Sequence, residues 1–165
     1  MATPIDVTPV NELELVIGRI IDAPRHAVWR CWTEEALLKQ WYCPKPWTVP
    51  EADLDVRPGG RFNTVFAGPD GERMENSGIW LEVVPEEYLV FTDAFTEGFM
   101  PQPDSFITGY VKLSDTEDGK TRFIWGARHP SAEKSKQHDD MGFEQGWGAA
   151  AEQLEETAQS ITAKA

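Results

Sequence analysis

The stretch Glu14-Leu-Val-Ile-Gly-Arg-Ile-Ile-Asp22 runs directly into Ala23-Pro24 and sets the order of the whole chain. Its Leu, Val and Ile residues predict a first strand over residues 13–21. A Trp-rich amphipathic segment follows, in which a new acidic start at Thr33-Glu34-Glu35 favours two short helices over one long helix. Pro58-Gly59-Gly60 then introduces a run of further strands. A sheet with helices before and after it must enclose either side chains or a ligand.

Outward from this stretch, strand patterns alternate with short turns rich in Gly, Pro and Asp. We predict six more strands, over residues 47–56, 61–67, 72–84, 88–95, 105–113 and 121–128. Consecutive strands joined by short turns form an antiparallel meander. Residues 1–11 contain Pro4 and Pro9 and are expected to form a flexible tail, with a single domain over residues 12–163.

The C-terminal segment has the clearest periodicity. Its apolar residues recur at steps of three or four and form one face of an α-helix: Phe143, Trp147, Ala150, Leu154, Ala158 and Ile161. Gly142 and Gly146 interrupt this helix on one side. Such glycines allow the helix backbone to approach either the sheet or a ligand, and packing against the sheet is the simpler explanation.

Composition limits the classes of function. The 165 residues carry 28 acidic and 15 basic side chains, a net charge of −13, which disfavours nucleic-acid and anionic membrane partners. No apolar run is long enough for a membrane span, and no secretory signal is visible, so we expect a cytoplasmic protein without membrane insertion. The oligomeric state is left open, with a homodimer among the options.

The search for reactive motifs yields little. Cys31 and Cys43 have no CxxC spacing and are expected to be reduced thiols. His138-Asp139-Asp140 lacks metal-ligand spacing, and no nucleotide-binding loop is found, so we predict neither a metal nor a cofactor.

Several motifs in order resemble a known family. They are Ile21-Asp22-Ala23-Pro24, Val28-Trp29, Trp41, Arg57-Pro58-Gly59-Gly60-Arg61-Phe62, Leu89-Val90-Phe91-Thr92 and Gly142-Phe143-Glu144-Gln145-Gly146-Trp147. Over residues 13–162 the chain resembles the START/Bet v 1-like superfamily, called SRPBCC, and within it the branch similar to the activator of Hsp90 ATPase. The resemblance implies an α+β helix-grip fold: a curved seven-stranded antiparallel sheet wrapped around the long C-terminal helix, with two short helices after the first strand. Its members include ligand-binding, lipid-transport, cyclase and hydrolase proteins, so the fold alone does not decide the function.

Seven of the eighteen aromatic residues are Trp, which is an unusual number; most of these rings are expected to fill the core, and several to line a cavity. We predict a ligand cavity between the sheet and the C-terminal helix, with the loop over residues 97–104 over or beside its mouth. Its candidate lining residues are Trp41, Trp47, Phe66, Trp80, Phe91, Phe106, Trp125, Met141 and Trp147.

Period-two alternation also places two titratable groups on inward faces. Asp93 shares a face with Leu89 and Phe91, and His129 shares a face with Trp125. If both point into the cavity, they are candidates for an acid–base pair, bridged by a ligand or a water. The alternative is that both lie near strand ends, solvated or bonded to the backbone.

Three functions are compatible with these patterns. The first is a protein that binds a small hydrophobic molecule without an established reaction. The second is an enzyme of cyclase or hydrolase type acting on an aromatic or polyketide-like compound, with Asp93 and His129 as catalytic residues. The third, suggested by the resemblance, is a stress-related or chaperone-interaction module.

Overall fold

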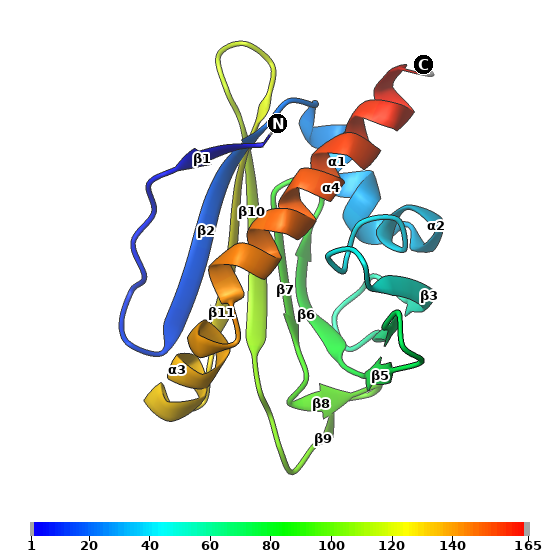
Figure 1. Ribbon diagram of the computed structural model, residues 1–165, viewed down its shortest axis with the longest axis vertical. Coiled ribbons are helices and arrows are strands. Elements are labelled where there is room, and N and C mark those ends of the chain that lie inside the picture. The colour runs from blue at the N-terminus through cyan, green and yellow to red at the C-terminus, as the bar shows by residue number, and fades with distance from the viewer. Residues whose placement is uncertain (1, 164–165) are drawn as a thin grey trace.

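A computed structural model describes residues 2–163 of the chain (Figure 1). Its helices are α1 (Arg25–Thr33), α2 (Glu35–Leu38), α3 (Ala132–Asp140) and α4 (Phe143–Ala163). Its strands are β1 (Thr3–Ile5), β2 (Glu14–Ile21), β3 (Thr48–Leu54), β4 (Phe62–Ala67), β5 (Arg73–Asn76), β6 (Ile79–Val84), β7 (Tyr88–Thr92), β8 (Phe95–Thr96), β9 (Met100–Pro101), β10 (Thr108–Asp115) and β11 (Thr121–Arg128).

The largest sheet is antiparallel and has the strand order β1-β2-β11-β10-β7-β6. Strand β10 therefore lies between β7 and β11, as the meander predicts. Helix α4 runs diagonally across one face of this sheet, and α1 lies beside its C-terminal half (Figure 1). The arrangement confirms the predicted mixed α+β class with a curved antiparallel sheet and a long C-terminal helix.

A second sheet, of order β3-β4-β5, continues the first one beyond β6. The Pro-Gly-Gly segment makes the connection: the amide of Gly59 donates to the carbonyl of Trp80 at 2.8 Å, and the amide of Trp80 donates to the carbonyl of Gly60 at 3.1 Å. Gly59 has a φ of +81°, which a glycine adopts without strain. The single strand predicted over residues 72–84 is thus two strands, one in each sheet. It breaks before Gly78, where a β-carbon would lie 2.3 Å from the carbonyl oxygen of Thr92.

The N-terminal segment is more ordered than the flexible tail that its prolines predict. Strand β1 pairs with β2, with Thr3 opposite Ile20 and Ile5 opposite Gly18. Gly18 makes room for this segment, because a β-carbon there would lie within 3 Å of the Ile5 and Val7 side chains. The absence of a side chain at Gly18 therefore leaves room for the Ile5 and Val7 side chains to pack over β2 while β1 forms the edge strand of the sheet.

The predicted apolar stripe of α4 faces the core. Phe143, Ala150, Leu154 and Ala158 are buried, and Trp147 and Ile161 pack against the same cluster at its edge. Within the described residues, no helix is long and apolar enough to cross a membrane.

Candidate functional site: an aromatic cavity

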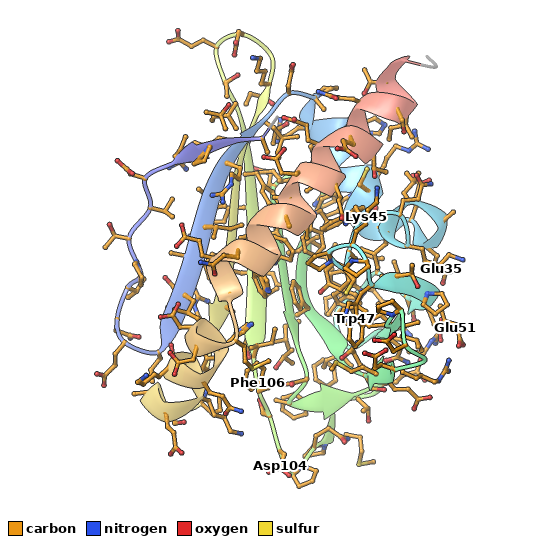
Figure 2. All side chains as sticks on the ribbon, in the orientation of Figure 1. Glu35, Lys45, Trp47, Glu51, Asp104 and Phe106 are labelled. Carbon is orange, nitrogen blue, oxygen red and sulfur yellow. The ribbon has the colours of Figure 1, made fainter. Side chains whose placement is uncertain are left out.

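A cavity of about 690 Å³ opens at the end of the molecule where α4 begins. It lies between the first turns of α4, the segment after α2, strands β4 and β7, and the chain that leads into β10. Figure 2 shows Phe106 and Asp104, two of its lining residues, near the hairpin that β8 and β9 form. Because ordinary ligand sites have ~300 to 1,000 Å³, this volume suits a small organic molecule.

Six of the nine side chains predicted to contact a ligand line this cavity. They are Phe66, Phe91, Phe106, Trp125, Met141 and Trp147. Trp125 and Trp147 stack there with ring centroids 4.2 Å apart. Contact of these six with a ligand stays a prediction.

The other three predicted residues, Trp41, Trp47 and Trp80, lie outside the lining. Trp41 is buried and its indole N–H donates to the carbonyl of Cys31 at 2.9 Å. Trp80 is fully buried under Phe62, with ring centroids 4.3 Å apart and nearly parallel planes. Trp47 lies on the β3 side of the molecule, away from Phe106 (Figure 2). These indoles fill the core or cover the edge sheet.

Sequence reasoning missed several lining residues, both inside and outside regular strands and helices. Tyr42 follows Trp41 and stacks with Trp125 at 6.2 Å between ring centroids, and no hydrogen bond of its hydroxyl is found among residues 2–163. Burial raises the pKa of Tyr42 far above its ordinary value, so its hydroxyl stays protonated at neutral pH. Phe62 and His138 were also missed. Only the Pro-Gly-Gly segment beside Phe62 offered a sequence signal.

Gly146 is the helical position that faces the empty space. It lines the cavity, and a β-carbon placed on it would have no packing neighbour within 4 Å. The expected packing of this glycine against the sheet is therefore wrong, because the sheet does not reach it. By contrast, a β-carbon on Gly148 would lie 2.8 Å from the Arg19 guanidinium.

The predicted mouth loop borders the cavity. Gln102, Pro103 and Asp104 line it on the side of the β8–β9 hairpin. Gln102 holds this loop to the segment between β7 and β8, since its backbone amide donates to the carbonyl of Ala94 at 2.9 Å.

Asp93 lines the cavity, and its carboxylate accepts hydrogen bonds from the segment that leads into β10. The carboxylate accepts hydrogen bonds from the amide of Phe106 at 2.9 Å, the amide of Ile107 at 3.2 Å and the hydroxyl of Ser105 at 3.1 Å. Such bonds fix the entry of the chain into β10. The geometry matches the backbone-bonded alternative for Asp93 that the sequence left open.

His129 is buried and forms its side-chain hydrogen bonds with other groups than Asp93. Its Nδ1 lies 2.8 Å from the carbonyl oxygen of Leu13, and its Nε2 lies 2.8 Å from Nδ1 of His138. Phe106 connects the two predicted residues, because its amide binds Asp93 and its ring lies 5.6 Å from that of His129. His138, which the sequence did not single out as an acid–base group, is the histidine that lines the cavity.

The cysteines are poor nucleophiles. Burial raises the pKa of Cys31 to about 12 and that of Cys43, which lines the cavity, to about 11. Both thiols are therefore protonated at neutral pH.

The charge of the lining is one-sided. Glu75, Asp93 and Asp104 line the cavity, and within residues 2–163 no Lys or Arg does. The lining therefore offers no counterion for an anionic ligand. Among the same residues, no three His, Cys, Asp or Glu side chains gather closely enough to hold a metal ion.

Comparison with known proteins agrees with this architecture. Residues 22–159 match the family described as activator of Hsp90 ATPase homolog 1-like protein, and the chain belongs to that family. Among solved structures, protein NE0264 from Nitrosomonas europaea is 39% identical, with a TM-score of 0.90 over 94% of this chain and 99% of that chain. Protein Ms6760 from Mycobacterium smegmatis is 28% identical, with a TM-score of 0.76 over 92% and 94% of the two chains.

A more distant structure shows the fold alone. The AHSA1-like protein from Aeromonas hydrophila is 17% identical, with a TM-score of 0.68 over 90% of this chain and 94% of that chain. No curated protein gives a significant match to the sequence.

Proposed function

We propose that this protein binds a small, mostly apolar and uncharged molecule in the cavity between the sheet and α4. The observation that carries the proposal is a cavity of about 690 Å³ that is partly open to solvent and is faced by aromatic rings and by a glycine of α4. Water in such a cavity contacts an apolar wall, and a bound apolar ligand removes that wall from water.

The lining chemistry narrows the class of ligand. Aromatic rings cover much of the wall, and the lining residues Glu75 of β5 and Asp104 are exposed to solvent. Without a lining Lys or Arg, an anion would lose its hydration without gaining a counterion. A neutral ring compound gains apolar contact at no such cost.

Native mass spectrometry of the protein purified from its own host tests the proposal. We expect a bound species that is released on denaturation. The Gly146→Leu variant should lose that species, because its side chain occupies the space beyond Gly146. The matched control is Ala149→Leu, an exposed position of the same helix, which should keep the species.

Retention of the species by Gly146→Leu would place binding outside the cavity. If the wild-type protein carries no bound species from its host, titration with neutral aromatic compounds tests whether the cavity binds such a molecule. Absence of saturable binding there would contradict the proposal.

Catalysis is the alternative that the cavity leaves open. Asp93 borders the cavity, and a carboxylate beside an apolar wall is a common general acid or base. Catalysis by Asp93 and His129 predicts that Asp93→Asn abolishes turnover of a cavity ligand, whereas simple binding predicts no turnover to lose.

The remaining expectations concern partners and location. A chaperone partner and a role in stress are suggested by the name of the family alone. Cytoplasmic location and a homodimer likewise stay predictions.

A further inference from the structure

The hydrogen bond between His129 and Leu13 fixes the position of one proton. The carbonyl oxygen of Leu13 can only accept, so Nδ1 of His129, 2.8 Å away, must carry hydrogen. The backbone amide of His129 donates to the same oxygen at 2.9 Å. Two donors from one residue to one carbonyl hold the imidazole in a single orientation.

This proton determines the tautomer of the second histidine. A neutral imidazole protonated at Nδ1 has a bare Nε2, which must accept its hydrogen bond. The donor at 2.8 Å is Nδ1 of His138, so His138 also carries its hydrogen on Nδ1. The Nε2 atom of His138 is then bare as well.

His138 presents this bare nitrogen at the cavity wall. His138 lines the cavity whereas His129 does not, and Nδ1 of His138 is directed toward His129. Within residues 2–163 no hydrogen bond to Nε2 of His138 is found, although the residue is only 9% exposed. Nε2 itself keeps accessible surface, so a molecule in the cavity can reach it, and a ligand that supplies a donor gains a hydrogen bond there.

Aromatic neighbours keep the ring of His138 in place and uncharged. Its centroid lies 4.9 Å from that of Phe106, 5.1 Å from Phe143 and 5.7 Å from Trp147. Burial, and secondarily the nearby His129, lowers the pKa of His138 to about 4, so the ring is neutral at physiological pH.

We propose that Nε2 of His138 is the polar anchor of the cavity and accepts a hydrogen bond from a hydroxyl or N–H group of a neutral aromatic ligand. His129 is its positioning residue. The carbonyl of Leu13 fixes the tautomer of His129, and the bare Nε2 of His129 in turn fixes the tautomer of His138. This inference rests on the proposed function and adds to it the chemical class of ligand: an aromatic compound with one neutral donor, such as a phenol.

Nuclear magnetic resonance of the histidine ring nitrogens tests the proton arrangement directly. In the ¹⁵N-labelled wild-type protein at about pH 8, where an ordinary imidazole is neutral, we expect both histidines to be protonated at Nδ1. In His129→Phe the acceptor is gone, and His138 should shift toward the other tautomer. A His138 protonated at Nε2 in the wild-type protein would overturn the proposal.

Two matched probes test the ligand class. 1-Naphthol and 1-methoxynaphthalene share a ring system, but only the first has a donor. We expect wild-type protein to bind 1-naphthol about two- to thirteenfold more tightly, the range of one net hydrogen bond. His138→Phe preserves aromatic bulk and should abolish this preference while still binding 1-methoxynaphthalene. In His129→Phe, the preference for 1-naphthol should fall in proportion to the fraction of His138 that is no longer protonated at Nδ1.

The outcomes separate the two proposals. Equal binding of both probes to wild-type protein overturns the histidine anchor and leaves the binding function standing. Binding of neither probe contradicts both. If His138→Phe does not fold, the wild-type resonances decide: Nε2 of His138 should shift on addition of 1-naphthol and not of 1-methoxynaphthalene, and unchanged shifts overturn the anchor.

Discussion

The two ends of the interior are built from the same kinds of residue, yet one end is solid and the other is hollow. At the solid end Trp32 of α1 is fully buried, with five aromatic rings whose centroids lie 4.9 to 6.4 Å away. Three of these rings, Tyr42, Phe91 and Trp125, form a wall that the solid end shares with the cavity. At the hollow end the covering helix is α4, and its residue Gly146 has no side chain to fill the space. The difference teaches that aromatic content does not by itself create a cavity; the absence of a side chain from the covering helix does.

Trp32→Ala should give the largest effect and tests the solid end. Loss of a buried indole from a filled core lowers the free energy of unfolding by about 3–5 kcal/mol. Phe66→Ala, at the partly exposed wall of the cavity, should cost about 1 kcal/mol because less apolar area is removed from contact. Urea denaturation measures both values. Equal losses would show that the two ends are packed alike.

The stability of the hollow end should depend on pH through His138. Its pKa is about 4 in the folded protein and 6.5 ordinarily, so the unfolded chain binds more protons between these values. The stabilisation is complete above about pH 6.5 and is lost as pH falls toward 4, by at most about 3 kcal/mol.

His138→Phe should flatten this dependence relative to wild type in denaturation curves measured between these pH values. His26→Gln is the control, because His26 is an exposed residue whose ring pairs with Glu86 at the surface. A wild-type slope that survives in His138→Phe would assign the pH dependence to other groups.

Asp93→Asn tests how the loop at the cavity is held. The amide replaces a carboxylate that accepts from three donors, and we expect a loss of about 1–3 kcal/mol. Hydrogen exchange at the amides of Phe106 and Ile107 should accelerate. The control Asp104→Asn changes an exposed carboxylate on the same loop and should stay within about 0.5 kcal/mol of wild type. Unchanged exchange in Asp93→Asn would contradict the anchoring role.

Gly146→Ala should have the smallest effect and the opposite sign. Alanine stabilises a helix interior by up to about 1 kcal/mol over glycine, and the added methyl group meets only empty space. Gly142→Ala is the contrast, since its φ of +91° strains any other residue and should lower stability. A loss of stability in Gly146→Ala would mean that the cavity is more tightly closed than its lining indicates.

Much of the fold could be predicted because its signals are local and periodic. The α4 stripe, the paired short helices and the inward faces of β7 and β11 each follow from the spacing of apolar residues. The break between β5 and β6 escaped prediction, because it depends on the close approach of Gly78 to the backbone of Thr92. This approach is set by the pairing of β6 with β7 and leaves no periodic signal in the sequence.

The candidate site was only half visible in the sequence. Inward-facing positions on strands, such as Phe91 and Trp125, were identified from alternation. Trp41 and Trp80 are equally apolar but fill the core. Apolar character in the sequence predicts burial, but it does not tell whether a cavity lies next to the side chain. His138 was missed as an acid–base group because its role comes from a partner, His129, on another element.

The sequence by itself determined the class of fold, the face that α4 buries and the acidic character that disfavours anionic partners, because these depend on periodicity and summed charge. Only the tertiary structure decided where the interior stays empty and which nitrogen of His138 is bare. Both are set by contacts among residues far apart in the chain. The walls of the cavity come from several strands and helices. The tautomer of His138 follows from that of His129, whose Nδ1 donates to the carbonyl of Leu13 more than 100 positions away.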